Sequence, residues 1–213
     1  MPADDEVRAL VTGATGYIGG RLVPRLLERG HRVRALARNP DKLADVPWRE
    51  QVDIARGDLG DAASLRSAFD GVDVVYYLVH SMGTSSDFVA AEAAAARNVV
   101  AAAADSGVRR LVYLGGLHPH GAELSPHLRS RVAVGDILFE SGIETVVLQA
   151  GIVVGAGSAS FEMLRHLTHR LPAMTTPKWV HNKIQPIAID DVLHYLTEAA
   201  TAAVPESRAW DIG

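Results

Sequence analysis

Short apolar runs alternate with longer amphipathic stretches along most of the chain. Several of the runs are almost unbroken, as in VDVVYYLVH at residues 72–80. Such a run is typical of a strand in a parallel sheet, because helices cover both faces of that kind of sheet. The runs predict strands at residues 7–13, 31–38, 52–59, 72–80, 109–116 and 144–151.

The amphipathic stretches between these runs predict helices. In the first of them, residues 17–30, the apolar side chains recur at helical spacing and Gly30 provides the C-terminal stop. Pro24 lies inside this helix and is expected to weaken or bend it. Asp61 is expected to cap the next helix. Further helices are predicted over residues 87–106 and 125–141.

The alternation of strands and helices predicts the fold class. Strands separated by helices of this length need right-handed parallel crossovers, which build an α/β fold with a doubly wound parallel sheet. Residues 155–186 are the least regular part of the chain and combine one short helix with a proline-punctuated loop. Because late loops of this fold lie above the carboxyl ends of the strands, we expect this segment to line a substrate crevice.

Three evenly spaced glycines separate the first predicted strand from the first predicted helix. In such a turn the first glycine permits a sharp bend, the second lets the backbone approach a pyrophosphate, and the third lets the helix pack closely on the sheet. The helix start adds free N–H groups and the positive end of its dipole. The turn therefore predicts dinucleotide binding. Its expected contacts are Gly13, Thr15, Gly16, Tyr17, Ile18 and Gly19.

The end of the second strand indicates which dinucleotide to expect. An Asp or Glu there would accept a hydrogen bond from the ribose 2′-hydroxyl, whereas an arginine accommodates a 2′-phosphate. Arg38 stands at this position, with Lys42 nearby, and no carboxylate precedes Asp41. The planar guanidinium is suited to phosphate. We therefore predict NADP(H) in preference to NAD(H); the alternative is that Arg38 is a solvated surface residue.

Composition narrows the partners and the chemistry. A net charge of −4 argues against nucleic acid or an anionic membrane as a partner, since both favour clustered Lys and Arg. The absence of cysteine excludes disulfides, thiolate catalysis and cysteine-based metal sites. The N-terminus lacks a signal-peptide pattern, and the alanine-rich stretch is too polar for a membrane span. We expect a cytoplasmic protein with a small-molecule substrate, in which residues 1–213 form one domain.

The G-x-x-G-x-x-G spacing resembles that of the extended and atypical branches of the short-chain dehydrogenase/reductase superfamily. The resemblance implies NAD or NADP at this turn. It also implies that the carboxylate of Asp58 approaches the adenine amino group, and that the end of the fourth strand passes the adenine ribose. The further cofactor contacts expected on this basis are Asp58, Leu59, Leu78, Val79 and His80.

The catalytic residues of that superfamily are replaced in this chain. Its reductases carry a serine after the fifth strand and a Tyr-x-x-x-Lys on the next helix. Here residues 115–116 are glycines, and the best alignment puts His127 in place of the tyrosine and Arg131 in place of the lysine. In one interpretation His127 donates a proton and Arg131 binds the cofactor ribose or phosphate. In the other, residues 125–131 are only a helix start with His127 exposed in its first turn.

Longer segments sharpen the resemblance. YYLVHSMG, YLGGL, LSPHLRSR, GSASFEMLRHL, LPAMTTPKWV and IQPIAIDDVLHYL together are similar to NmrA-like, atypical NAD(P)H-binding proteins of bacteria, over residues 7–213. The resemblance implies a Rossmann fold and an oxidoreductase or epimerase-like protein. In the matching subfamily a second, C-terminal domain follows, and we expect it to be absent here. Gln149 and Ala133 replace the Arg and Glu usual in that subfamily.

Several side chains are expected near the substrate. For Trp179, stacking on a substrate and closing the core remain equal alternatives. No metal is expected, because the spacing of Glu162, His166 and His169 matches no known zinc signature. The expected substrate contacts are Met82, His118, Trp179, His181 and Gln185.

Together these features predict an oxidoreductase that moves a hydride between NADPH and a small carbonyl or conjugated organic substrate. The alternative is a non-catalytic NADP(H)-binding regulator or redox sensor, a role that some NmrA-like proteins are taken to have. Superfamily members often pair through two helices. A homodimer through residues 87–104 and 125–141 is therefore also expected.

Overall fold

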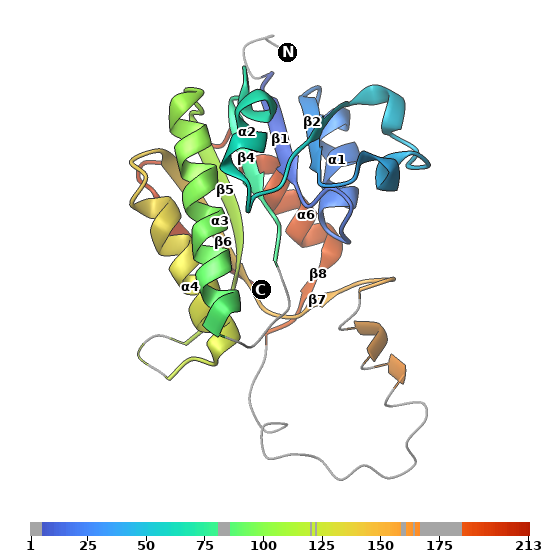
Figure 1. Ribbon diagram of the computed structural model, residues 1–213. Coiled ribbons are helices and arrows are strands. Elements are labelled where there is room, and N and C mark those ends of the chain that lie inside the picture. The colour runs from blue at the N-terminus through green and yellow to red at the C-terminus, as the bar shows by residue number, and fades with distance from the viewer. Residues whose placement is uncertain are drawn as a thin grey trace.

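The computed structural model describes residues 6–80, 86–119, 121, 123–158, 161–163, 165–166 and 185–213. Within these residues seven parallel strands form one sheet, in the order β3-β2-β1-β4-β5-β6-β9 (Figure 1). The strands are β1 (Arg8–Thr12), β2 (Arg32–Ala37), β3 (Asp53–Arg56), β4 (Val74–Tyr77), β5 (Arg110–Gly116), β6 (Glu144–Ala150) and β9 (Arg208–Ile212). The predicted α/β fold with a doubly wound parallel sheet is confirmed.

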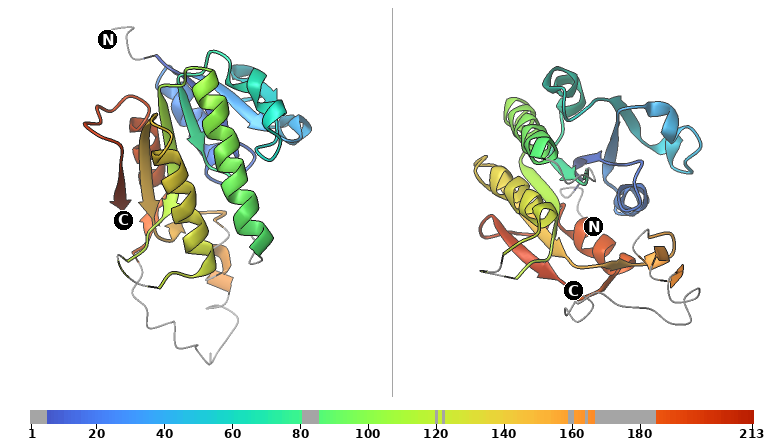
Figure 2. Two further views of the ribbon diagram at one scale, coloured as in Figure 1. Left: turned by 60° about the vertical axis from the view of Figure 1, so that its left-hand side comes forward. Right: turned by 60° about the horizontal axis from the view of Figure 1, so that its bottom comes forward.

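Helices cover both faces of the sheet (Figure 2). One face carries α1 (Gly19–Glu28) and α6 (Ile189–Glu198), and the other carries α2 (Ala62–Phe69), α3 (Ser86–Asp105) and α4 (Pro126–Phe139). The alternation of side chains along each strand serves both layers. In β1, Ala9 and Val11 belong to the core beneath α1 and α6, while Leu10 belongs to the core beneath α2 and α3. This explains the nearly unbroken apolar runs.

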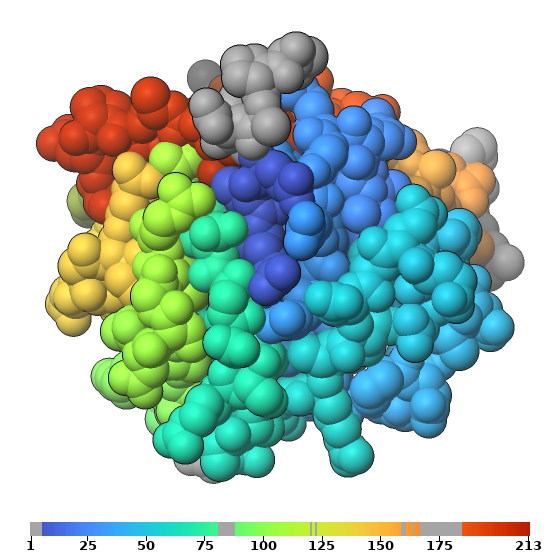
Figure 3. Space-filling model, turned by 90° about the horizontal axis from the view of Figure 1, so that it is seen from above, coloured from blue at the N-terminus to red at the C-terminus, as the bar shows by residue number. Residues whose placement is uncertain are grey.

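The sheet has a switch point between β1 and β4. From β1 the chain moves outward to β2 and β3, and then crosses back to β4 on the other side of β1. At such a point the connections leave in opposite directions, which opens a crevice at the carboxyl ends of the strands. Figure 3 shows the opposite end of the molecule, with the start of β1 near its centre between the red C-terminal segment and the cyan segment around residue 50.

The irregular region begins and ends at a second, small ladder. β7 (Val153–Val154) and β8 (Ile187–Ala188) pair in parallel, and both lie just beyond the carboxyl edge of the main sheet (Figure 1). The predicted irregular segment 155–186 leaves from one of these strands and returns to the other. The ladder therefore places the two ends of this segment beside the carboxyl edge of the sheet.

Most predicted elements are present, with shifted ends. The first helix begins at Gly19 rather than at residue 17, because the glycine turn continues through Ile18. Asp61 caps α2 as predicted, its carboxylate accepting a hydrogen bond from the amide of Ala63 at 3.1 Å. Sequence reasoning predicted neither α6 nor β9. The signals were present in the buried positions of α6 and in the RAWDI run of β9.

Pro24 lies inside the first helix, which continues past it; the expected weakening or bending stays a prediction. A proline lacks the N–H that would bond the carbonyl four residues earlier, which here belongs to Gly20. The buried indole of Trp48 donates to that carbonyl instead, with a distance of 3.1 Å from Nε1 to the oxygen. The segment between β2 and β3 therefore satisfies the group that the proline leaves free, and α1 runs from Gly19 to Glu28.

A double-mutant cycle tests whether the indole of Trp48 takes the place of the backbone N–H that Pro24 lacks. We expect Trp48→Phe to cost about 1–3 kcal/mol of unfolding free energy, since it leaves the Gly20 carbonyl without a donor. In a Pro24→Ala background the restored N–H takes over, so the same substitution should cost less. Urea unfolding of the four proteins measures both values. Equal costs in the two backgrounds would contradict this account of Pro24.

Candidate functional site

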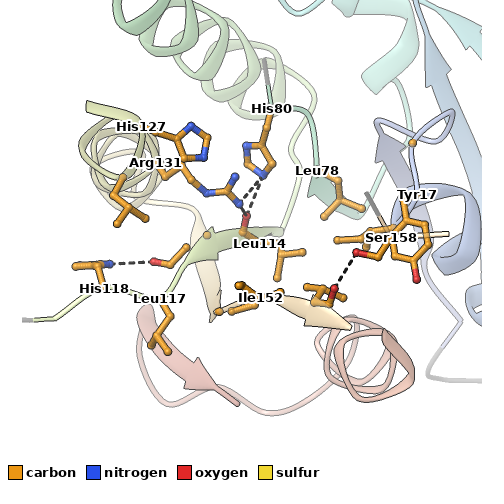
Figure 4. A pocket seen from close by; sticks show the side chains of 18 of the residues that line it. Tyr17, Leu78, His80, Leu114, Leu117, His118, His127, Arg131, Ile152 and Ser158 are labelled. Carbon is orange, nitrogen blue, oxygen red and sulfur yellow. Dashed lines mark hydrogen bonds between the residues drawn. The ribbon is translucent and has the colours of Figure 1, made fainter. Parts of the chain in front are cut away.

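A cavity of about 1090 Å³ opens at the carboxyl edge of the sheet (Figure 4). The glycine turn before α1 lines one end, and the start of α4 lines the other. The ends of β4, β5 and β6 and the strand β7 form the wall between them. The predicted site residues that this cavity brings together are Gly13, Gly16, Tyr17, Ile18, Gly19, Leu78, His80, His118, His127, Arg131 and Gln185.

The glycine turn holds the start of α1 directly against the end of β1. Gly13 has φ of +71°, and a Cβ placed on Gly19 would lie 2.8 Å from the carbonyl carbon of Gly13. Among the described residues, the amides of Tyr17, Ile18 and Gly19 donate no hydrogen bond, and the first turn of α1 carries no acidic side chain. The turn therefore offers free donors and a positive dipole end to an anion.

At the opposite end Arg131 lies against the end of β5. Its Nη2 donates to the carbonyl oxygen of Leu114 at 3.1 Å and contacts Nε2 of His80 at 3.0 Å. Nε2 of His80 also lies 3.1 Å from the carbonyl oxygen of Leu114. A guanidinium can only donate and a carbonyl oxygen can only accept, so this nitrogen accepts from Arg131 in one tautomer of His80 and donates to Leu114 in the other. Burial, together with the charge of Arg131, lowers the pKa of His80 to about 3. His80 is therefore a neutral ring packed against the guanidinium of Arg131.

Arg131 occupies the space beside the expected serine position. A Cβ on Gly116 would lie 2.9 Å from Cδ2 of Leu128 and 3.3 Å from Nε of Arg131. Its helix is fixed from below by Tyr113, whose hydroxyl donates to the carbonyl of Arg131 at 3.0 Å. The glycine at this position therefore accompanies the replacement of the lysine by a longer, forked side chain.

His127 lies at the rim of the cavity, one helical turn before Arg131. The helix starts as predicted, with Ser125 as its cap and Pro126 in the first position, and the amide of Leu128 donates to Oγ of Ser125 at 3.3 Å. His127 is exposed, yet it lines the cavity. The geometry thus keeps both interpretations open, because a first-turn exposed histidine is also within the site.

Five predicted cofactor contacts do not line this cavity: Thr15, Arg38, Asp58, Leu59 and Val79. Asp58 and Arg38 are exposed at the carboxyl ends of their strands, beyond the glycine turn. An oxygen of Asp58 accepts from the amide of Gly60 at 2.9 Å, and the side chains of Leu59 and Val79 pack in the core beneath α2 and α3. Their contacts with a cofactor stay predictions. Met82, Trp179 and His181 lie outside the described residues.

Sequence reasoning missed the apolar wall and one polar group. Leu114, Leu117, Leu128, Ile152 and Val153 line the cavity between its two polar ends. The apolar residues after β6 gave a signal for the last two, but no pattern pointed to Ser158, whose hydroxyl donates to the carbonyl of Val153 at 2.8 Å. The hydroxyl of Tyr17 is enclosed and has no hydrogen-bond partner in the described part of the chain.

Two further features bear on the site. A second cavity of about 110 Å³ lies behind Gly116, and Gln149, which replaces the arginine of the resembling subfamily, lines it. In the part of the chain that the structure describes, no three His, Asp or Glu side chains are grouped as a metal site would require. The same residues include no helix with both the length and the apolar character of a membrane span.

The comparisons with known proteins agree with this geometry. The family model described as NAD(P)H-binding matches residues 13–153. Cinnamoyl-CoA reductase 1 of Oryza sativa subsp. japonica is 43% identical over 109 residues, which make up 48% of this chain and 32% of that protein. The chain thus spans about a third of the length of that relative.

Solved structures agree in fold. MoeE5 in complex with UDP-glucose and NAD is 21% identical, with a TM-score of 0.78 over 97% of this chain and 76% of that one. Triphenylmethane reductase of Citrobacter sp., complexed with NADP(H), is also 21% identical, with a TM-score of 0.77 over 96% of this chain and 69% of that one. At this identity the likeness shows the fold alone.

The environment of His80 gives a prediction for pH. Because its folded pKa lies below that of an unfolded histidine, the unfolded chain binds more protons between about pH 6.5 and 3, so stability falls as the pH falls through this range. We expect imidazole NMR signals of His80 to show a neutral ring that does not titrate between pH 8 and 5, and its pKa to rise in Arg131→Met. A ring that protonates near pH 6.5 in the wild type would contradict the assignment.

Proposed function

The chain belongs to the NAD(P)H-binding family, and on this premise we propose that it is an oxidoreductase that transfers hydride between NADP(H) and a small carbonyl or conjugated organic substrate. One observation carries the proposal: a single continuous cavity joins an anion-binding glycine turn to an arginine and a histidine on α4. A dinucleotide needs a site for its pyrophosphate and a separate end for its reacting ring. The match to a reductase in rice supports the reaction class.

The residues present fit such a cofactor. The glycine turn packs too closely for a Cβ at Gly19, which holds the start of α1 against the end of β1, and the free amides of Tyr17, Ile18 and Gly19 would hold the pyrophosphate. The enclosed hydroxyl of Tyr17 offers a further donor. When bound, the nicotinamide supplies or accepts the hydride.

The protein's own groups would supply the proton and the electrostatics. His127, at the rim, would donate the proton to the reduced substrate, since histidine is the side chain that most often acts as a general acid in enzymes. Arg131 would hold an oxygen-bearing end of the substrate with its fixed charge. The neutral ring of His80, in contact with the guanidinium, would help to keep it in place, and the apolar wall around Leu114 and Ile152 would exclude water.

The preference for NADP(H) rests on the end of the second strand. Parallel pairing of β1 with β2 aligns Thr12 with Leu36, so Arg38 follows β2 beside the glycine turn. Arg56 ends β3 opposite Ala37, and Arg38, Lys42 and Arg56 are all exposed. These cations would surround the 2′-phosphate of NADP, which NAD lacks.

We also propose a homodimer through α3 and α4. The two helices pack side by side on one face of the sheet, and α3 exposes the small side chains of Ala90, Ala91, Ala94 and Ala101. Small exposed residues let a second helix pair approach closely. Light scattering of the purified chain measures the mass directly.

Cofactor choice is tested by Arg38→Gln. We expect NADPH affinity to fall about 10-fold or more while NADH affinity stays unchanged, because only NADPH carries the 2′-phosphate that Arg38 would bind. Arg32→Gln is a matched control, since Arg32 lies at the other end of the same strand and pairs with Glu6. Fluorescence titration with both nucleotides measures the four affinities. If NADH binds the wild type as tightly as NADPH, the preference is wrong.

Turnover separates an enzyme from a sensor. We expect oxidation of NADPH, followed at 340 nm, with at least one member of a panel of quinones, enones and ketones. His127→Gln should lower kcat about 10²-fold or more with little change in KM, because a proton donor acts in the transition state. Tight NADPH binding without turnover on any panel member, and no effect of His127→Gln, would instead favour the regulator or redox sensor.

A further inference from the structure

The cavity has an uneven charge. None of the described residues that line it is Asp or Glu, and Arg131 is the one permanently charged side chain among them. The remaining polar side chains at its end of the cavity are His80, His118 and His127. In a chain of net charge −4, this end of the cavity is thus an acid-free region with a fixed positive charge.

Arg131 has no ionic partner within the described residues. It donates to a backbone carbonyl, and its other polar neighbour is the neutral imidazole of His80. Glu92 influences it only through space, because the carboxylate of Glu92 is buried between α3 and α4 and accepts from the hydroxyl of Ser130 at 2.7 Å. A partly buried guanidinium without a carboxylate is costly, and burial accordingly lowers the pKa of Arg131.

The atoms of the guanidinium differ in what they can still bind. Nε is enclosed beside Gly116 and has no hydrogen-bond partner in the described structure. Nη2 is occupied by Leu114 and His80. Nη1 makes no hydrogen bond to any described residue and is not enclosed, so its two N–H groups are available to a ligand in the cavity.

The phosphates of the cofactor have a different site. The free amides of the glycine turn lie at the other end of the cavity, and Figure 4 shows Tyr17 and Ser158 on one side and Arg131, His127 and His118 on the other. The charge of Arg131 thus remains for the substrate. A single guanidinium matches a monoanion, whereas a phosphate dianion would need further cations.

We propose that the substrate is an organic carboxylate, whose oxygens accept hydrogen bonds from Nη1 of Arg131. Its hydrocarbon or conjugated body lies against the apolar wall of Leu114, Leu117, Leu128 and Ile152. This proposal rests on the proposed function, because it names the substrate class of the same cavity. It leaves His127 free to act as the proton donor, since the carboxylate takes the charge of Arg131 only.

The test compares an acid with its uncharged isostere. We would titrate trans-cinnamate and trans-cinnamamide into the NADPH-saturated chain at pH 7.5 by calorimetry, because the two differ in charge but hardly in shape. We expect the acid to bind about 10-fold or more tightly, and this ratio to fall to about 1 in Arg131→Met. Arg129→Met is the matched control, since Arg129 is exposed on the same helix and does not line the cavity.

Each outcome supports or overturns the proposal. Equal affinities in the wild type, binding of neither compound, or an acid preference that survives in Arg131→Met would overturn it. Should Arg131→Met not fold, as judged by circular dichroism, the wild-type ratio and its retention in Arg131→Lys still decide. NADPH binding is measured separately, and the ratio of the affinities for acid and amide is also measured in the absence of NADPH. If the wild type does not bind NADPH, the proposed function is wrong. If it binds NADPH but shows no preference for the acid over the amide, only the proposal of a carboxylate substrate is wrong.

Discussion

The close contact between the start of α1 and the end of β1 is the constraint on which the site depends. No side chain fits at Gly19, because its Cβ would press on the Gly13 carbonyl, so the helix starts where the strand ends. This contact turns the free amides of the first turn toward the crevice at the switch point. Without it the cavity would have no anion-binding end, whatever stood on α4.

The end of the cavity opposite the glycine turn has its own fixed polar group. A reductase must hold the reacting end of its ligands against a fixed polar group, and here a buried network of Arg131, His80 and the Leu114 carbonyl does so. Within the described residues no carboxylate forms an ion pair with Arg131, and Glu92 acts on it through space. The charge of Arg131 therefore acts on whatever occupies the cavity. The close approach of its side chain also accounts for the glycine at position 116, where a Cβ would meet Nε of Arg131.

Periodicity was sufficient for the fold class and for six of the seven strands of the sheet, because the central strands are covered on both faces, which makes runs such as residues 72–80 apolar throughout. Gly13, Gly16 and Gly19 identified one end of the cavity because they are close in the sequence and form a single turn. His127 and Arg131 were found by spacing on one helix. The contact between Arg131 and His80 and the bond from Trp48 to the Gly20 carbonyl join residues 51 and 28 positions apart, and no local pattern reports such contacts. Shifted helix ends likewise depended on how the turn packs.

The most direct test of this account is a crystal structure of the chain with NADPH. We expect the pyrophosphate to bind the amides of Tyr17, Ile18 and Gly19. The nicotinamide should lie in the end of the cavity lined by Gly116 and Arg131, with the guanidinium still bonded to the carbonyl of Leu114. A dinucleotide bound in the reverse direction, or outside this cavity, would contradict it.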